Sequence, residues 1–288
     1  MTSPMGFLDR RSPVFARRAM ASSSSPLVTR VGLRVLEEGG NAADAAVAMA
    51  GMLAVAEPMM SGLGGDTMIL VWSAGDQQAL GLNGSGMAPS GASPEHIAPR
   101  TLMPEHGAAS VTIPGAVDGW CTLLERFGTG SLEQLWDPAI TYARDGYPVG
   151  ESSAGFWMVG TPLLERSSSP QARELLLPNG AAPQPGQLIR FPQLANTLER
   201  VAREGRSGFY EGPVAEAIAQ TISQDGVPTT TADLAAQQHR GEWVEPLSVS
   251  YRSREVLGLP PNCQGVVTWP GTSAASPLWR SPSWWWEH

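Results

Sequence analysis

Residues Gly39-Gly40-Asn41-Ala42-Ala43-Asp44-Ala45-Ala46-Val47-Ala48 lead into Glu57-Pro58-Met59-Met60-Ser61-Gly62-Leu63-Gly64-Gly65-Asp66, and together they predict a helix that feeds a glycine loop. Asn41 is a residue type that caps the amino end of helices, and Asp44 falls in the first turn, where the helix end is positive. Pro58 prevents the helix from continuing. We therefore interpret Asn41 and Asp44 as capping residues rather than as catalytic ones.

The glycine loop is expected to turn the chain from this helix into a strand. Gly62, Gly64 and Gly65 allow backbone conformations that side chains forbid, and the apolar run at residues 68–72 predicts a buried strand. We favour a purely structural turn at these glycines over a role as hydrogen-bond donors toward a substrate. Asp66, at the end of the loop, fits a plain cap. The alanine-rich helix before the loop offers a surface that a neighbouring element can approach closely.

The remaining chain is dominated by further helix signals. Several predicted helices open with Pro and close with Gly, as helices often do, and they cover about residues 26–38, 116–126, 138–144, 192–203 and 213–224. Residues 167–191 are rich in Pro, Gly and Ser and predict a long surface connection, and residues 247–257 predict a strand pair. No internal repeat is visible.

These stretches resemble the gamma-glutamyltransferase family, in which a GGNA-DAA helix, an EP-SG-GG loop and a strand follow one another at this spacing. Residues 112–120, 126–129 and 137–140 are similar to the family's PG-V-G, R-YGT and PAI sequences. Phe209-Tyr210-Glu211-Gly212 is similar to its FY-G element, and residues 246–262 to its YRG-PP region. The resemblance covers about residues 11–267.

The resemblance implies both a fold and a chemistry. The family belongs to the N-terminal nucleophile hydrolases, so we expect an α+β fold, a partial four-layer alpha-beta-beta-alpha sandwich that represents the large-subunit half only. In that family a precursor cuts itself, and the hydroxyl of a new amino-terminal Thr attacks the substrate while its free amine acts as the base. That Thr begins the small subunit, downstream of Pro260-Pro261, and is expected beyond the end of this chain. No catalytic residue is therefore assigned within it.

The end of the chain differs from the rest. The resemblance stops near Val267, so we divide the chain into residues 1–267, the family region, and residues 268–288, a non-familial tail. The tail holds Trp269, Trp279, Trp284, Trp285 and Trp286, half of the chain's 10 Trp residues, without apolar periodicity. We favour the interpretation that the tail is read out of frame. The alternative is a genuine aromatic segment that packs on the body or binds a partner.

Composition excludes several other functions. The chain has no Lys, which removes the P-loop and Schiff-base lysines, and its net charge of −8 argues against nucleic-acid binding. Two Cys and four His without paired spacing predict no metal, and we expect no cofactor. Cys121 is expected to be a core residue rather than a catalytic thiol. Without a signal peptide or a long apolar run, we expect a cytoplasmic location and no membrane partner.

Ser85 is the one candidate substrate-binding residue. By the resemblance, typical transpeptidases carry an acidic-aromatic-Arg-Glu segment before an M/A-P pair, and that Arg grips the alpha-carboxylate of the gamma-glutamyl group. This chain has Asn83-Gly84-Ser85-Gly86-Met87-Ala88-Pro89, so Ser85 stands where the Arg would be. A neutral hydroxyl does not replace that charge. Two interpretations stay open: a glycine turn after a strand, or the rim of an acyl-substrate pocket.

Two functional hypotheses follow. The first is acyl transfer or hydrolysis of small-molecule gamma-glutamyl or related amides, with a small subunit of the same family, if one is encoded, as partner. The second is an inactive fragment or pseudoenzyme that acts only as a partner-binding module. An independent serine hydrolase is a weaker third hypothesis, because Gly84-Ser85-Gly86 lacks the G-x-S-x-G elbow and no His is placed by the sequence.

Overall fold

The computed structural model describes residues 13–93, 104–166 and 169–263. It combines helices with small antiparallel sheets, which confirms the expected α+β class. The helical elements are α1 (Pro26–Glu37), α2 (Ala42–Ala56), η1 (Ala108–Ser110), α4 (Ala116–Phe127), α5 (Leu132–Asp145), α6 (Glu151–Glu165), α7 (Pro170–Leu176), η2 (Pro178–Gly180), α8 (Pro192–Glu204), α9 (Ser207–Tyr210), α10 (Gly212–Gln224) and α11 (Thr231–Ala236). The strands are β1 (Thr67–Ser73), β2 (Gln78–Gly84), β3 (Tyr147–Pro148), β4 (Leu188–Ile189), β5 (Glu242–Val244), β6 (Leu247–Tyr251) and β7 (Arg254–Gly258).

The first two helices form as the sequence predicts. In α2, the Asn41 side chain accepts hydrogen bonds from the backbone N–H groups of Ala43 and Asp44, and the Asp44 side chain accepts one from Asn41 N–H in return. This reciprocal pair is a capping box. Asp44 also accepts bonds from the backbone and the hydroxyl of Thr129, at 2.8 and 2.6 Å. The interpretation of Asn41 and Asp44 as capping residues is confirmed, and Asp44 additionally ties α2 to the turn after α4.

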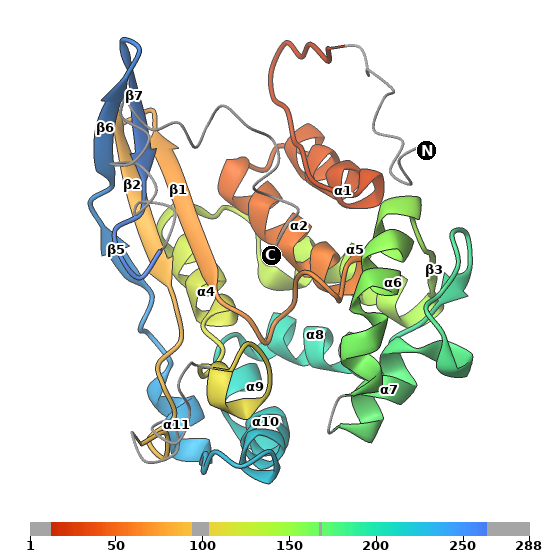
Figure 1. Cartoon of the computed structure of the whole chain (residues 1–288). Coiled ribbons are helices and arrows are strands. Elements are labelled where there is room, and N and C mark those ends of the chain that lie inside the picture. The colour runs from red at the N-terminus through yellow and green to blue at the C-terminus, as the bar shows by residue number, and fades with distance from the viewer. Residues whose placement is uncertain (1–12, 94–103, 167–168, 264–288) are drawn as a thin grey trace.

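The main sheet has the order β1-β2-β5 and lies along one side of the helices (Figure 1). Strand β1 pairs antiparallel with β2, from Thr67 opposite Gly84 to Ser73 opposite Gln78. The prediction of a buried strand is wrong for one face of β1: Met68, Leu70 and Trp72 are exposed, whereas Ile69 and Val71 pack against the core. Side chains alternate between the two faces of a strand, and helices cover only one face here. Strand β1 therefore presents an apolar outer face.

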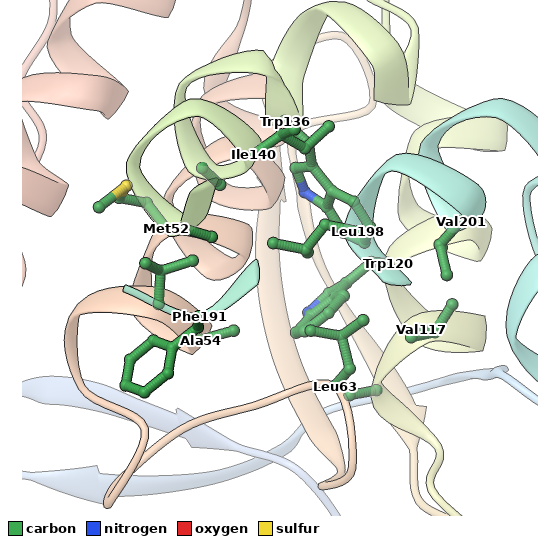
Figure 2. Close-up of a cluster of buried hydrophobic side chains, with 14 of the residues drawn as sticks. Met52, Ala54, Leu63, Val117, Trp120, Trp136, Ile140, Phe191, Leu198 and Val201 are labelled. Atoms are coloured by element: carbon green, nitrogen blue, oxygen red, sulfur yellow. The ribbon is translucent and has the colours of Figure 1, made fainter. Parts of the chain in front are cut away.

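The core lies between the sheet and the central helices, and two tryptophans mark its centre (Figure 2). Trp136 of α5 is fully buried, donates from Nε1 to Val47 O at 3.0 Å, and meets Trp120 of α4 edge to face at 5.9 Å. A Cβ at Gly51 would lie 2.5 Å from Trp136 Nε1, so α2 can approach α5 only because this position is glycine. The expected close approach to the small-residue helix is thus confirmed.

Helix α5 starts earlier than predicted. It begins at Leu132, because Ser131 and Gln134 form a capping box, and Pro138 lies inside the helix rather than at its first position. A proline marks a helix start only where no stronger capping signal precedes it.

The predicted surface connection at residues 167–191 is also wrong for its described part. It contains α7, η2 and β4, and it buries Leu177, Ile189 and Phe191. The high Pro and Gly content of this segment is typical of loops, and its helices and strands are too short for their apolar residues to show a helical or strand periodicity. Helix α6, which precedes this segment, was not predicted. The strand pair at residues 247–257 is confirmed as β6 and β7.

Candidate functional site

Ser85 directly follows β2 and joins two asparagines in a group that we call the neutral cluster, Asn83, Ser85 and Asn262. Ser85 N–H donates to Asn83 Oδ1 at 3.1 Å as the strand ends. Asn262, which lies 177 residues further along the chain, donates from Nδ2 to Ser85 Oγ at 2.8 Å. Ser85 Oγ is also 3.2 Å from Asn262 Oδ1, which accepts from Asn83 Nδ2 at 3.0 Å. Every one of these bonds joins uncharged groups.

A carboxylate adjoins the neutral cluster. Asp66 Oδ1 accepts hydrogen bonds from the backbone N–H groups of Gly86 at 2.8 Å and Gly115 at 3.2 Å. Asp66 is exposed, and its Oδ2 makes no hydrogen bond within the described residues. Instead of acting as a plain cap, Asp66 joins the glycine loop to the segment after β2 and to the start of α4.

Close backbone approaches around Ser85 require glycine. A Cβ at Gly86 would lie 1.5 Å from Ile113 O, and a Cβ at Gly115 would lie 2.3 Å from Gly84 O. No side chain fits at such distances, so these positions bring the segment after β2 against the start of α4. Sequence patterns alone do not indicate why glycine is needed there.

The glycine loop itself is less constrained than predicted. Gly62, Gly64 and Gly65 do not have φ between +20° and +160°, and a Cβ at Gly64 would meet nothing within 4 Å. The left-handed conformations that glycine allows are therefore not used at these three positions. The loop is held by its carbonyl, since Gly65 O accepts from Gly115 N–H and Ala116 N–H at 3.0 and 2.9 Å. This contact supports the structural interpretation of the turn.

A buried glutamine fixes the Ser85 segment from the interior. Gln237, just after α11, is 0% exposed; its Oε1 accepts from Met87 N–H at 3.0 Å and its Nε2 donates to Ser85 O at 3.2 Å. The two bonds hold the backbone on both sides of Gly86. Gln237 and Met87 are 150 residues apart in sequence, so no local pattern indicates this contact.

The segment after Gln237 is fixed in turn by Asp118. This fully buried carboxylate in the first turn of α4 accepts from the backbone N–H groups of residues 239, 240 and 241 at 2.9, 2.8 and 2.7 Å. It also pairs with Arg206, which contacts Glu125 as well. Burial lowers the pKa of Arg206, but its bonds to Glu125 and Asp118 raise it by more, so the guanidinium stays charged. Asp118 and Gln237 were missed by sequence reasoning.

Three further features of the described residues were considered: the thiol of Cys121, possible metal ligands and the length of the helices. Cys121 is buried, and burial raises the pKa of its thiol to about 11, which confirms it as a core residue. Within residues 13–93, 104–166 and 169–263, His, Cys, Asp and Glu side chains do not gather in any group of three that could hold a metal ion. The described helices are also too short or too polar to cross a membrane.

The sequence profile of gamma-glutamyltranspeptidase matches residues 28–270, most of the chain. The chain belongs to the gamma-glutamyltranspeptidase family. Two curated relatives resemble it over most of its length. The glutathione hydrolase-like YwrD proenzyme of Bacillus subtilis is 36% identical over 255 residues, which are 88% of this chain and 48% of that protein. The oxamate amidohydrolase proenzyme of Klebsiella pneumoniae is 38% identical over 256 residues, 86% of this chain and 47% of that protein. The chain thus spans about half the length of these relatives.

Two solved structures share the fold of this chain. The cephalosporin acylase from Bacillus halodurans matches with a TM-score of 0.82 at 36% identity, over 93% of this chain and 51% of that one. The gamma-glutamyltranspeptidase of Helicobacter pylori matches with a TM-score of 0.78 at 30% identity, over 88% of this chain and 73% of that one. Both similarities agree with the α+β fold described above.

Proposed function

We propose that this chain forms the large-subunit portion of an enzyme that hydrolyses gamma-glutamyl or related acyl amides, or transfers their acyl group to an acceptor. The observation that carries the proposal is the construction of the Ser85 segment, which is partly exposed yet held on both sides of Gly86 by the buried Gln237. Binding residues are commonly placed on loops that a rigid scaffold positions. Ser85 then lies at the rim of the acyl pocket.

The relatives support cleavage of an acyl amide without favouring one acyl group. Their names describe a glutathione hydrolase-like protein, an oxamate amidohydrolase and a cephalosporin acylase. Ser85 weakens the case for glutathione as substrate of this chain. A hydroxyl does not replace a charge-assisted hydrogen bond to a carboxylate, which is worth roughly 1.5 to 3 kcal/mol.

We infer that the nucleophile is a Thr outside residues 1–288, as the family resemblance implies. Its free α-amine would take the hydroxyl proton as the oxygen attacks the amide carbonyl, the amine product would leave, and water or an acceptor amine would then release the acyl group. The part of this chain is to orient the acyl group. Its neutral cluster offers hydrogen bonds, and Gln237 and Asp118 keep that cluster in place.

A small subunit is the proposed partner. The outer face of β1 leaves Met68, Leu70 and Trp72 exposed by 39%, 47% and 61%. A second sheet packed on this face, with its own helices behind it, would complete a four-layer sandwich and remove that apolar surface from water. The same observation favours a second candidate function, a non-catalytic module that only binds such a partner.

Activity and gene sequence together test the proposal. We expect the purified 288-residue chain to release no p-nitroaniline from gamma-glutamyl-p-nitroanilide. We expect the gene beyond the codon for Val267, translated in all frames, to continue to a Thr nucleophile segment whose full product cleaves amides. Turnover by the 288-residue chain alone would place the nucleophile within it and overturn the proposal. A continuous but inactive product would favour the partner-binding module.

A further inference from the structure

Asp66 places a negative charge beside the neutral cluster, and one oxygen of its carboxylate is free to bind a ligand. Asp66 Oδ1 is held by two backbone N–H groups, at 2.8 and 3.2 Å, so the carboxylate has a fixed position. Those donors are uncharged, and within the described ranges Asp66 takes part in no ion pair. The side chain is exposed, and Oδ2 makes no hydrogen bond there. A fixed carboxylate with a free oxygen can pair with a cation that arrives from solvent.

The neutral cluster beside Asp66 has donors to spare. Each asparagine amide carries two N–H groups. Asn83 Nδ2 uses one toward Asn262, and Asn262 Nδ2 uses one toward Ser85, which leaves a second N–H on each. Both asparagines and Ser85 are at least partly exposed. The cluster can therefore donate to a carbonyl oxygen of a bound molecule, and it presents no cation to a carboxylate.

The charge and the donors are close enough to act on one small molecule. Ser85 directly precedes Gly86, and the N–H of Gly86 is 2.8 Å from Asp66 Oδ1. Adjacent Cα atoms are about 3.8 Å apart, so Asp66 and the neutral cluster are close neighbours, and ligands with short acyl chains are the ones to test.

We propose that Asp66 and the neutral cluster bind acyl groups that end in a protonated amine. The ammonium pairs with Asp66 Oδ2, a carbonyl oxygen of the same molecule accepts from the neutral cluster, and an acyl chain that ends in a carboxylate is repelled. The catalytic meaning of this specificity rests on the proposed function, but the binding itself can be measured without catalysis. Asp66 is thus assigned as a specificity-determining residue.

Coulomb's law sets the expected effect. A unit charge about 4 Å from Asp66 in water changes affinity about fivefold, so ligands that end in an ammonium and in a carboxylate should differ about 5- to 30-fold at low salt. The difference should shrink as salt screens exposed charges.

The test uses three amides of matched length: 4-aminobutyramide, neutral pentanamide and anionic glutaramate. Each is titrated into the ¹⁵N-labelled 288-residue chain at low salt, and the backbone amide signals of Ser85, Gly86 and Gly115 are followed by NMR. We expect the tightest binding for 4-aminobutyramide, weaker binding for pentanamide and the weakest for glutaramate. Equal affinity for all three amides, or no response at these signals, would overturn the proposal.

A charge-matched pair of variants makes the test specific. Asp66→Asn keeps an oxygen that can accept from Gly86 and Gly115 but removes the charge, so it should abolish the preference for the ammonium ligand. Asp76→Asn removes the same charge from the exposed β1–β2 turn, where Asp76 accepts from Ser73 Oγ at 2.8 Å, and should retain the preference. Thermal melts by circular dichroism verify that both variants fold.

The two variants also separate the possible failures. An equal loss of preference in both variants would show a general effect of the net charge of −8 and would refute the role of Asp66. Selective binding in a protein whose full gene product cleaves no amide would refute the proposed function and leave this inference standing.

Discussion

Replacing Gln237 by Met should loosen the Ser85 segment without emptying the space that the side chain fills. Met has a similar length and packs well in irregular interiors. The substitution removes the bond that Met87 N–H donates at 3.0 Å and the bond that Ser85 O accepts at 3.2 Å. A buried backbone group left without a partner costs about 1 to 3 kcal/mol; Ser85 and Met87 are half-buried, so the lower part of this range applies to each, and burying Met instead of an amide offsets part of the loss. We expect a loss of about 1 to 3 kcal/mol in the free energy of unfolding.

Urea unfolding measures this loss, and hydrogen exchange locates it. A local loss of about 2 kcal/mol corresponds to about 30-fold faster exchange of the Met87 amide. The matched control is Gln238→Met, because the side chain of the neighbouring Gln238 makes an exposed hydrogen bond to Glu211 at 2.9 Å and no other within the described residues. Its expected effect is below about 0.5 kcal/mol. If both variants unfold alike and Met87 exchanges at the wild-type rate, Gln237 does not hold the segment.

Three further predictions concern the scaffold. Burial raises the pKa of Asp44, but hydrogen bonds from Asn41, Thr129 and Gly130 lower it by more, so the net shift is downward. Asp44 therefore stabilises the fold above its unfolded-state pKa and loses this effect as pH falls through its folded-state value; Asp44→Asn should flatten the acid limb of a stability-against-pH curve. Gly51→Ala should destabilise by about 1 to 3 kcal/mol through the clash with Trp136, measured by thermal melts, whereas Gly64→Ala, in open space, should leave the melting temperature unchanged. Tyr147→Phe should raise stability by up to about 1 kcal/mol in urea unfolding, because the buried hydroxyl has no hydrogen-bond partner in the described part of the chain; a loss of stability would indicate a bound water.

The sequence predicted those helices whose ends contain capping residues or a proline at the first position. The start of α2 follows from Asn41 and Asp44 alone, because both partners of the capping box lie within one turn. The same logic places α1, α8 and α10 within a residue or two. It fails at α5, where Pro138 was given more weight than Ser131. The exposed face of β1 could not be predicted, since an apolar run does not show whether one or both faces are covered.

The candidate site was only partly accessible from sequence. Ser85 was identified through a family motif, but its partners lie far away in the chain: Asn262 is 177 residues from Ser85, and Gln237 is 152. Asn and Gln are common residues without a spacing rule, so nothing in the sequence marks them. Asp66 was visible only as the end of a glycine loop, and its contact with Gly86 depends on the antiparallel pairing that brings the ends of β1 and β2 together.

Helix α4 explains how the exposed site remains ordered. Its amino end supplies Gly115, which meets the carbonyl of Gly65 and the carboxylate of Asp66, while Asp118 one turn later binds the segment that carries Gln237. A Cβ at Gly119 would lie 2.3 Å from Thr67 Cγ2, so a glycine in the helix interior, which costs about 1 kcal/mol in helix propensity, lets α4 reach β1. One helix therefore fixes both sides of the Ser85 segment. The acyl-binding half of the proposed site is thus built by contacts within this chain, and it does not depend on the nucleophile for its shape.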